Sequence, residues 1–357
     1  MKTWMIDTLG ASVERMGIAL DSNGDASEVE GVLNPATTRS RDGTLLMYPR
    51  CVAAGNVSRI GLVEAAATAG DPIFERLGFA LEPREPYELR DTPGGFGCED
   101  PRVTFVPVLD LYVMAYTAFG AAGPRIALAL SNDAYVWERL GPVDFSAPGL
   151  PHGDDKDGVF FPEPVLSPAG VISLAFYHRP MQHIIAPDGR AAASIALERP
   201  PRKRECTRIA YVPLAAVLAD RTNLLKVAES ALVLEAGPAW GLVKNGGGTP
   251  PVRVAEGWLS FFHGVDVRSN EQGLVSGLVY AAGMVMHDAE RPDIIRYRST
   301  VPLFAPETAD ECHGVVANVV FPTGIDVAPE PGPRTFDVYY GMADSKIGRV
   351  RIALQDA

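Results

Sequence analysis

Short runs of β-branched and aromatic residues recur along the chain between clusters of Gly, Pro, Asn and Asp. Runs of this length and composition predict strands, whereas few windows show a helical period of about 3.6 residues. The clearest runs are TLLMYPR (44–50), LYVMAYTA (111–118), VISLAFYHR (171–179), WLSFFHGV (258–265) and TFDVYYGMA (335–343). The best helix candidate is the short segment Leu214–Asp220, which follows a proline. We therefore expect an all-β protein.

A repeat becomes visible when these runs are aligned together with the next apolar run after each of them. The next runs begin SRIGL, RIALALS, RIAYVPL, YAAGMVM and GRVRIAL, with markers at Arg59, Arg125, Arg208, Tyr280 and Arg349. The markers define units of about 70 residues, a size that suits a four-stranded propeller blade with long loops. The pattern predicts a five-bladed β-propeller that forms a single catalytic domain over residues 1–357. Approximate recurrence in any β-rich protein is the alternative.

Charge and cysteine usage narrow the class of partner. The chain has 32 Lys and Arg against 44 Asp and Glu, a formal net charge of −12, which disfavours binding to nucleic acid or to an anionic membrane surface. The four cysteines are far apart and form no CxxC pair, which suits reduced thiols in the cytoplasm. No apolar stretch reaches the length of about 18 residues that a membrane helix needs. We expect a soluble cytoplasmic protein, and a homo-oligomer is compatible with the sequence.

The densest candidate for chemistry is the segment Gly94–Thr104, which contains Glu99-Asp100-Pro101-Arg102. Its glycines do not form a dinucleotide fingerprint, because a proline and a β-branched run come after them instead of a helix. Glu99 and Asp100 are adjacent, so in an extended segment they point to opposite sides. One carboxyl can serve as an acid while the other pairs with Arg102 or Arg59. A structural turn with an Asp before a Pro is the alternative.

Cations at strand ends and in Gly-rich loops form a second candidate. Arg179 follows His178 at the end of a strand, Lys244 opens the stretch KNGGGTPP, and His263 lies in FFHGVD. Together Arg179, Lys244 and His263 can bind a small oxyanion, with Arg as a fork and Lys as a point charge. Ordinary solvated cations and a hydrogen-bonded histidine are the alternative. The spacings fit neither a zinc nor a calcium site, so we expect no metal.

These residues, taken in series, resemble glycoside hydrolase family 130, the mannoside phosphorylases and related mannosidases built on a five-bladed β-propeller. The matching segments run in order from about residue 34 to 344: NPA (34–36), SRIG (58–61), EDPRVT (99–104), KD (156–157), FPE (161–163), HRP (178–180), Lys244, Gly248 with PP (250–251), Trp258, HGVD (263–266), YRS (297–299), NVVFPTG (318–324) and YYGMAD (339–344). Each segment is weak alone, and their order and distances make the series specific.

The resemblance implies a role for each group. It implies that Asp100 is the general acid, acting through a substrate hydroxyl, and that Arg179, Lys244 and His263 hold phosphate. It also implies that Asn34, Arg59 and Asp344 line the subsite for the non-reducing mannose, and we expect Glu99 to bind substrate as well. The implied reaction joins phosphate to a β-mannoside with inversion, which gives α-mannose 1-phosphate and a free sugar, with inorganic phosphate as co-substrate and no further cofactor.

Physical chemistry is consistent with this scheme and leaves alternatives. A glycosidase needs two carboxylates, whereas a phosphorylase can work with one, because phosphate is itself an anionic nucleophile. We expect burial and Glu99 to raise the pKa of Asp100. A β-mannosidase would need Glu163 or Asp266 to activate water, and a non-catalytic sugar-binding propeller is the third candidate. Departures from the family pattern at Cys51, at Pro164 and over residues 267–277 bear on acceptor specificity.

Overall fold

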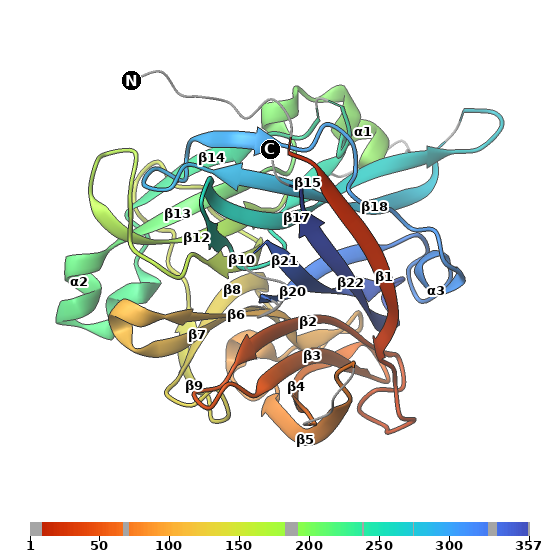
Figure 1. Ribbon diagram of the computed structural model, residues 1–357, viewed down its shortest axis with the longest axis horizontal. Coiled ribbons are helices and arrows are strands. Elements are labelled where there is room, and N and C mark those ends of the chain that lie inside the picture. Colours follow the sequence, from red (N-terminus) through yellow and green to blue (C-terminus); the bar gives the residue numbers. More distant parts are fainter. Residues whose placement is uncertain are drawn as a thin grey trace.

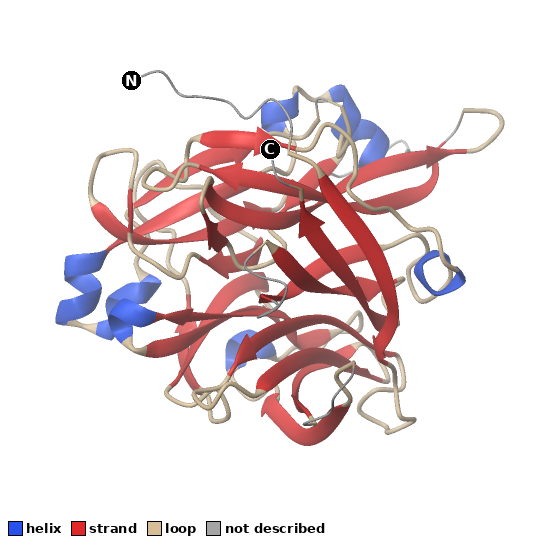
Figure 2. Cartoon of the chain, in the orientation of Figure 1, coloured by secondary structure: helices blue, strands red, loops and turns tan. Residues whose placement is uncertain are grey.

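The computed structural model describes residues 9–66, 71–182, 192–237, 239–273, 275–327 and 334–355. Strands dominate this part of the chain, and short helices lie at its periphery (Figure 2). The helices are α1 (Ala192–Glu198), α2 (Leu214–Ala219), α3 (Ala309–Cys312) and the 3-10 turns η1 (Pro86–Glu88), η2 (Pro107–Leu109), η3 (Pro201–Lys203) and η4 (Arg221–Leu225). The expected all-β class is confirmed, and α2 matches the predicted helix to within one residue.

The first two groups of strands join into one eight-stranded sheet. Each group is antiparallel, and the groups are connected by a short parallel pairing in which Val57 lies opposite Phe96 and Ser58 opposite Gly97. The strands are β2 (Gly31–Arg39), β3 (Leu45–Ala53), β4 (Val57–Ala65) and β5 (Phe74–Leu81), then β6 (Phe96–Val106), β7 (Leu111–Gly120), β8 (Gly123–Ser131) and β9 (Glu138–Pro142).

Two further groups form separate antiparallel sheets. In each sheet the chain steps outward through four strands, and a short extra strand pairs with the second of them. The third group has β10 (Asp155–Phe160), β11 (Val165–Leu166), β12 (Ile172–Pro180), β13 (Thr207–Pro213) and β14 (Glu229–Leu234), and the fourth has β15 (Lys244–Gly246), β16 (Val252–Val254), β17 (Gly257–Ser269), β18 (Val275–His287) and β19 (Ile295–Arg298).

The last group is completed by the N-terminal strand. β1 (Ala11–Leu20) pairs with β22 (Lys346–Leu354), which continues through β21 (Thr335–Met342) to β20 (Val320–Val327). Figure 1 shows the red β1 running beside the dark blue β22. The first and last strands of the described chain therefore belong to one sheet, and β2, which comes directly after β1, contacts both β6 and β20.

The repeat found in the sequence corresponds to these groups. Each aromatic run lies on the second strand of its group (β3, β7, β12, β17 and β21), and each marker lies on the third (β4, β8, β13, β18 and β22). The strand predictions are confirmed, and the marker runs occupy equivalent places in successive groups.

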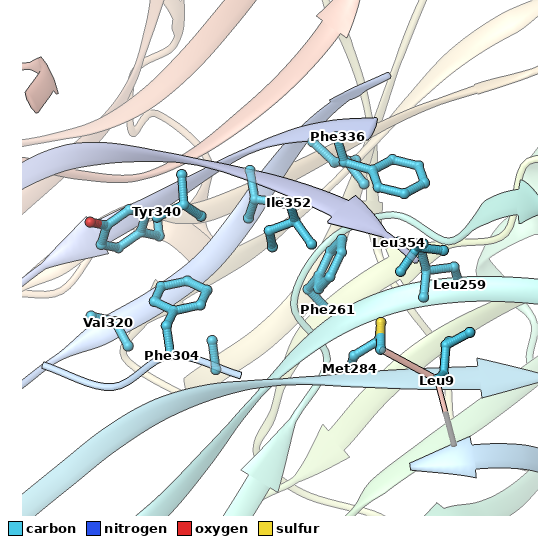
Figure 3. Packing of buried hydrophobic residues seen from close by; sticks show 14 of the residues in the cluster. Leu9, Leu259, Phe261, Met284, Phe304, Val320, Phe336, Tyr340, Ile352 and Leu354 are labelled. Carbon is cyan, nitrogen blue, oxygen red and sulfur yellow. The ribbon is translucent and has the colours of Figure 1, made fainter. Parts of the chain in front are cut away.

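Apolar side chains pack between neighbouring groups. In the largest cluster, Phe261 of β17 meets Phe336 of β21 with ring centroids 6.1 Å apart, and Phe304 meets Tyr340 at 5.3 Å (Figure 3). Such packing holds the first strands of the groups in fixed positions, because a close-packed interior resists displacement.

Three first strands carry a β-bulge at the same place. The pairing of β2, β6 and β10 with the next strand is interrupted in each case, between Leu33 and Ala36, Glu99 and Arg102, and Lys156 and Val159. Asn34, Asp100 and Asp157 occupy these bulges with φ of 43°, 45° and 61°. Asn and Asp adopt this left-handed region more readily than other side chains, and bulges redirect side chains near active sites.

Cys51, Cys98, Cys206 and Cys312 are all free, and the first three are buried. Over the residues described, the structure contains no helix of the length and apolar character that a bilayer crossing requires.

Candidate active site

A compact ionic cluster surrounds Asp100 on the bulge of β6. Arg50 of β3 donates from its two Nη atoms, to Glu99 Oε1 at 3.1 Å and to Asp100 Oδ1 at 3.2 Å. Lys156 of β10 donates to Glu99 Oε2 at 3.0 Å. Both carboxylates are buried, with 2% and 8% of their surface exposed. Residues from three strands thus meet at one point, and two cations face two carboxylates.

The electrostatics of Asp100 differ from the sequence-based expectation. Burial alone would raise the pKa of its carboxyl, but the charges of Arg50, Lys156 and Arg102 outweigh burial and hold the pKa below its ordinary value. The expected raised pKa is therefore wrong for the unliganded protein. The pKa of Asp100 is lowered instead because the fold places these cations around the carboxylate.

Asn34 and Asp344 complete this cluster. Asn34 Nδ2 donates to Asp100 Oδ1 at 2.9 Å, and within the described residues Asn34 Oδ1 is buried without a hydrogen-bond partner. Asp344 follows β21 with φ of 51°. Burial, together with the nearby carboxylates of Asp100 and Glu99, raises the pKa of Asp344 to about 6, although Arg50 and Lys156 oppose the shift. The raised carboxyl pKa of this site thus belongs to Asp344.

Arg59 and Arg102 do not form the pairs expected from the sequence. Arg59 Nε pairs with Glu82 at 3.3 Å. Ser58, its neighbour on β4, points to the opposite face of the sheet, where its Oγ accepts a hydrogen bond from Arg50 Nε at 2.9 Å. Arg59 therefore lies on the face away from Arg50. Arg102 is buried and donates to the backbone oxygen of Asp100 at 2.8 Å. Arg50 therefore takes the pairing role predicted for Arg59 or Arg102.

A second polar cluster forms around Asp157 on the bulge of β10. Arg179 of β12 donates from Nε to Asp157 Oδ2 at 2.7 Å and from Nη1 to Glu205. Burial alone would raise the pKa of Asp157, but the guanidinium charges of Arg179 and Arg102 overcome it and hold the pKa well below its usual range. His263 Nε2 lies 3.7 Å from Asp157 Oδ2.

His263 is fully buried and uncharged near neutral pH. Burial, reinforced by the cations Arg179, Arg102 and Lys244, lowers its pKa to about 3. Within the part of the chain that the structure describes, neither ring nitrogen has a hydrogen-bond partner. Buried polar groups without partners are uncommon in folded proteins, so these two nitrogens are available to a ligand.

The three residues predicted to bind an oxyanion do come together, but not as three cations. Arg179 and Lys244 both act on the charge state of His263, and the Lys244 ammonium lies 5.5 Å above the ring of Tyr280. His263 is neutral, and Arg179 is already paired with two carboxylates. The expected cationic trio is therefore corrected to two cations and a neutral imidazole.

The two carboxylates considered as bases for hydrolysis are placed differently. Asp266 accepts the backbone N–H groups of Gly241 at 2.9 Å and Leu242 at 2.8 Å, so both of its oxygens hold a turn. Glu163 is exposed in the loop between β10 and β11.

Four residues of the site, Arg50, Lys156, Asp157 and Glu205, had no role predicted from the sequence. Arg50 had a detectable signal, because it is a charged residue within the otherwise apolar strand LLMYPRCVA. Lys156 and Asp157 stood in a noted motif without an assigned role. Glu205 had no signal, since it lies in an irregular charged segment, PPRKREC.

A cavity of about 720 Å³ shares Lys156 with the carboxylate cluster. Its size falls within the range of about 300–1,000 Å³ typical of small-molecule sites. Asp154 and Lys156 line one part, and Arg90 covers the ring of Phe119 at 5.3 Å from its centroid.

Comparison with known proteins identifies the family. The family model of glycoside hydrolase family 130, described as beta-1,4-mannooligosaccharide phosphorylase, matches residues 15–184 and 226–356. The chain belongs to glycoside hydrolase family 130. This family 130 member is 29% identical over 263 residues to a 1,2-beta-oligomannan phosphorylase of Thermoanaerobacter sp. (strain X514). The match covers 73% of this chain and 69% of that protein.

Two further comparisons of this family 130 member concern a relative in sequence and a solved structure. It is 34% identical to a beta-1,4-mannooligosaccharide phosphorylase of Ruminococcus albus over 118 residues, which cover 33% of each chain. Its fold is shared with the solved beta-1,2-mannobiose phosphorylase of Listeria innocua, with a TM-score of 0.69, 20% identity and 96% coverage of both chains.

Proposed function

We propose that the protein is an inverting phosphorylase of β-mannosides, which converts phosphate and a β-mannosyl sugar into α-mannose 1-phosphate and a free sugar. The names of its relatives, which are phosphorylases of 1,2-β-oligomannan, β-1,4-mannooligosaccharide and β-1,2-mannobiose, support this reaction. The observation that carries it is His263, a fully buried imidazole whose two nitrogens lack partners within the described residues, beside the cations Arg179 and Lys244.

One polar cluster binds the sugar and the other binds phosphate. Asn34 and Asp344, beside Asp100, bind the non-reducing mannose, and Oδ1 of Asn34, which has no partner among the described residues, accepts a hydrogen bond from a sugar hydroxyl. Arg179, Lys244 and the N–H of His263 hold phosphate and direct one of its oxygens at the anomeric carbon. Glu99, also predicted to line the sugar site, acts there through Arg50 and Lys156. Arg59, predicted to line the same site, pairs instead with the exposed Glu82 and takes no part in this proposal.

In the reaction, a phosphate oxygen forms a bond to the anomeric carbon from the face opposite the leaving sugar. The bond from this carbon to the bridging oxygen breaks, and that oxygen receives a proton. Asp100 supplies the proton through a substrate hydroxyl. Because the pKa of Asp100 is lowered in the unliganded protein, the acid takes up its proton only in the complex, and Asp344, with a pKa of about 6, is a nearby proton donor.

Hydrolysis is the second candidate and is less well supported. Activation of water needs a free carboxylate near the anomeric carbon. Both carboxylate oxygens of Asp266 accept hydrogen bonds from backbone N–H groups, and Glu163 is exposed. Phosphate needs no such base, so the arrangement favours phosphorolysis without a further cofactor.

We also propose that the five strand groups are blades of one closed five-bladed β-propeller and that residues 1–357 form a single catalytic domain. The contacts of β2 with both β6 and β20 and the completion of the last sheet by β1 support a closed ring. The four unpaired cysteines suit a reducing cytoplasm, where we place the activity.

The cavity beside Lys156 is the proposed binding region for the leaving sugar. It adjoins the carboxylate cluster through Lys156, and its Arg90, Asp91 and Asp154 provide donors and acceptors for hydroxyl groups. Its volume of about 720 Å³ accommodates a sugar ring with room for further residues of an oligosaccharide.

One experiment tests the proposed reaction. The protein is incubated with β-1,2-mannobiose, β-1,4-mannobiose and β-mannosyl-glucose, each with and without inorganic phosphate, and products are followed by phosphorus NMR. We expect α-mannose 1-phosphate to form from at least one substrate only when phosphate is present. Equal cleavage without phosphate would establish the hydrolase, and no cleavage of any β-mannoside would contradict both.

A further inference from the structure

Arg179 is held between two carboxylates that differ in how firmly they are fixed. Asp157 lies on the bulge of β10, with 2% of its surface exposed. A Cβ added at Gly246 would clash with Asp157 Oδ2, so the carboxylate is packed tightly against this glycine. Glu205 lies in the loop before β13, and 15% of its side chain is exposed. Glu205 is the more exposed of the two partners, and its other carboxylate oxygen, Oε1, accepts the backbone N–H of Gln182 at 3.1 Å.

Glu205 occupies the part of the guanidinium that an incoming anion needs. Asp157 takes the Nε of Arg179, and Glu205 takes Nη1. A tetrahedral anion that binds Arg with two hydrogen bonds must use Nη1, because Nε is engaged by the fixed partner. Nη1 carries two N–H groups, so phosphate and Glu205 would lie side by side at one nitrogen and compete for the positive charge of the same guanidinium.

Charge makes this competition stronger. Arg179 with Asp157 and Glu205 carries a net charge of −1, and Arg102 and Lys244 are further cations that act on the neighbouring His263. A phosphate anion next to an ionised Glu205 would place two like charges on one guanidinium in a largely buried site. Such repulsion is weakly screened away from solvent.

We propose that Glu205 is a placeholder for phosphate, which occupies Nη1 of Arg179 in the unliganded protein and is displaced when phosphate binds. This inference rests on the proposed phosphate pocket and adds a residue to it. The placeholder keeps the buried guanidinium paired between turnovers, as a buried charge requires. It also weakens the binding of phosphate, because displacement of Glu205 is part of the binding equilibrium.

The first test compares variants by calorimetric titration with inorganic phosphate. We expect Glu205→Gln to bind phosphate roughly tenfold or more tightly than the wild type, since the amide keeps the shape of the side chain and removes its charge. The control is Glu235→Gln, which also removes one negative charge but from an exposed pair with Arg202. It should bind phosphate as the wild type does.

A role limited to stability would not produce tighter binding. Equal or weaker phosphate binding by Glu205→Gln, with a melting temperature like that of the wild type, would overturn the proposal. In phosphorolysis, the same variant should lower the apparent KM for phosphate while kcat changes less.

The second test uses the wild-type protein, so it does not depend on folding of a variant. Crystals soaked in phosphate should show a phosphate oxygen at Nη1 of Arg179 and the Glu205 carboxylate moved away. Bound phosphate with the Arg179–Glu205 pair intact, or no phosphate at Arg179, would overturn the inference. Phosphate that binds as described without any phosphate-dependent cleavage of β-mannosides would instead refute the proposed function and leave the placeholder in place.

Discussion

Asn34 Nδ2 donates a hydrogen bond to Asp100 Oδ1 over 2.9 Å, and each residue occupies the extra position of a β-bulge on the first strand of its group. Both have left-handed backbone conformations, with φ of 43° and 45°. An unbulged strand would continue to alternate its side chains between the two faces of the sheet. The paired bulges instead direct an amide and a carboxylate from neighbouring groups at each other, and the proposed chemistry depends on this meeting.

Asp100→Asn should reduce phosphorolysis by about 10²–10⁴-fold, the usual contribution of a general acid. The amide keeps the size of the side chain and tolerates the left-handed conformation, so the fold should be retained, although loss of the buried pair with Arg50 should lower the melting temperature. The control is Asp110→Asn, which lies at φ of 53° on an exposed turn paired with Arg41 and should retain full activity. Equal turnover by the Asp100 variant would show that Asp100 is structural.

Arg50→Ala should lose most of its activity and about 3 kcal/mol of unfolding free energy, because it leaves buried Glu99 and Asp100 without a shared cation. Arg59→Ala breaks only the pair with the exposed Glu82 and should cost at most about 1 kcal/mol. Urea unfolding and steady-state rates measure both effects. Arg50→Lys provides a milder variant that keeps the charge. Comparable losses in the Arg50 and Arg59 alanine variants would contradict the assignment of Arg50.

Asp344 should make the protein less stable as pH rises. Its pKa is about 6 in the folded protein against 3.8 in the reference state, so between these values the folded state binds more protons and the free energy of unfolding falls with pH. The full effect is at most about 3 kcal/mol and is complete above pH 6.

Asp344→Asn removes this titration and should therefore be more stable than the wild type at pH 7.5. The difference should shrink as pH falls toward 4, where the wild-type carboxyl is protonated. Urea unfolding at several pH values measures the difference. A gap that stays constant over this range would mean that Asp344 has an ordinary pKa. The variant should also bind mannosides less well, since its carboxylate is proposed to contact the sugar.

His263 should remain neutral throughout the range from pH 5 to 8, because its pKa is lowered to about 3. Nitrogen NMR of labelled histidines checks this, with His263→Asn used to assign the signal. Addition of phosphate should shift the ring resonances, since the imidazole then gains a hydrogen-bond partner. A protonation midpoint near 6.5 in the unliganded protein would restore the cationic trio that the sequence suggested.

Arg90→Ala should raise the KM for the mannoside, and for the acceptor sugar in the reverse reaction, by about tenfold, as expected for the loss of one hydrogen bond from a charged group. The KM for phosphate should stay the same, because Arg90 lines the cavity beside Lys156 and not the cluster at Arg179. Arg84→Ala, which removes an exposed cation paired with Glu85, is the control. If phosphate and sugar affinities fall together, the cavity is not a separate acceptor region.

Local sequence determined the strands, their order in five groups and the presence of the Glu99–Asp100 motif, because alternation and turn residues act over a few neighbouring positions. Tertiary structure decided which cation reaches that motif. Arg50 and Arg59 lie on paired strands but on opposite faces, and only the packing of the groups selects the face of Arg50. The tertiary structure also decided the charge of His263 and the partners of Arg179, since both depend on burial and on side chains from distant segments such as Glu205 and Asp157. These quantities sum interactions over the whole fold, so no local pattern encodes them.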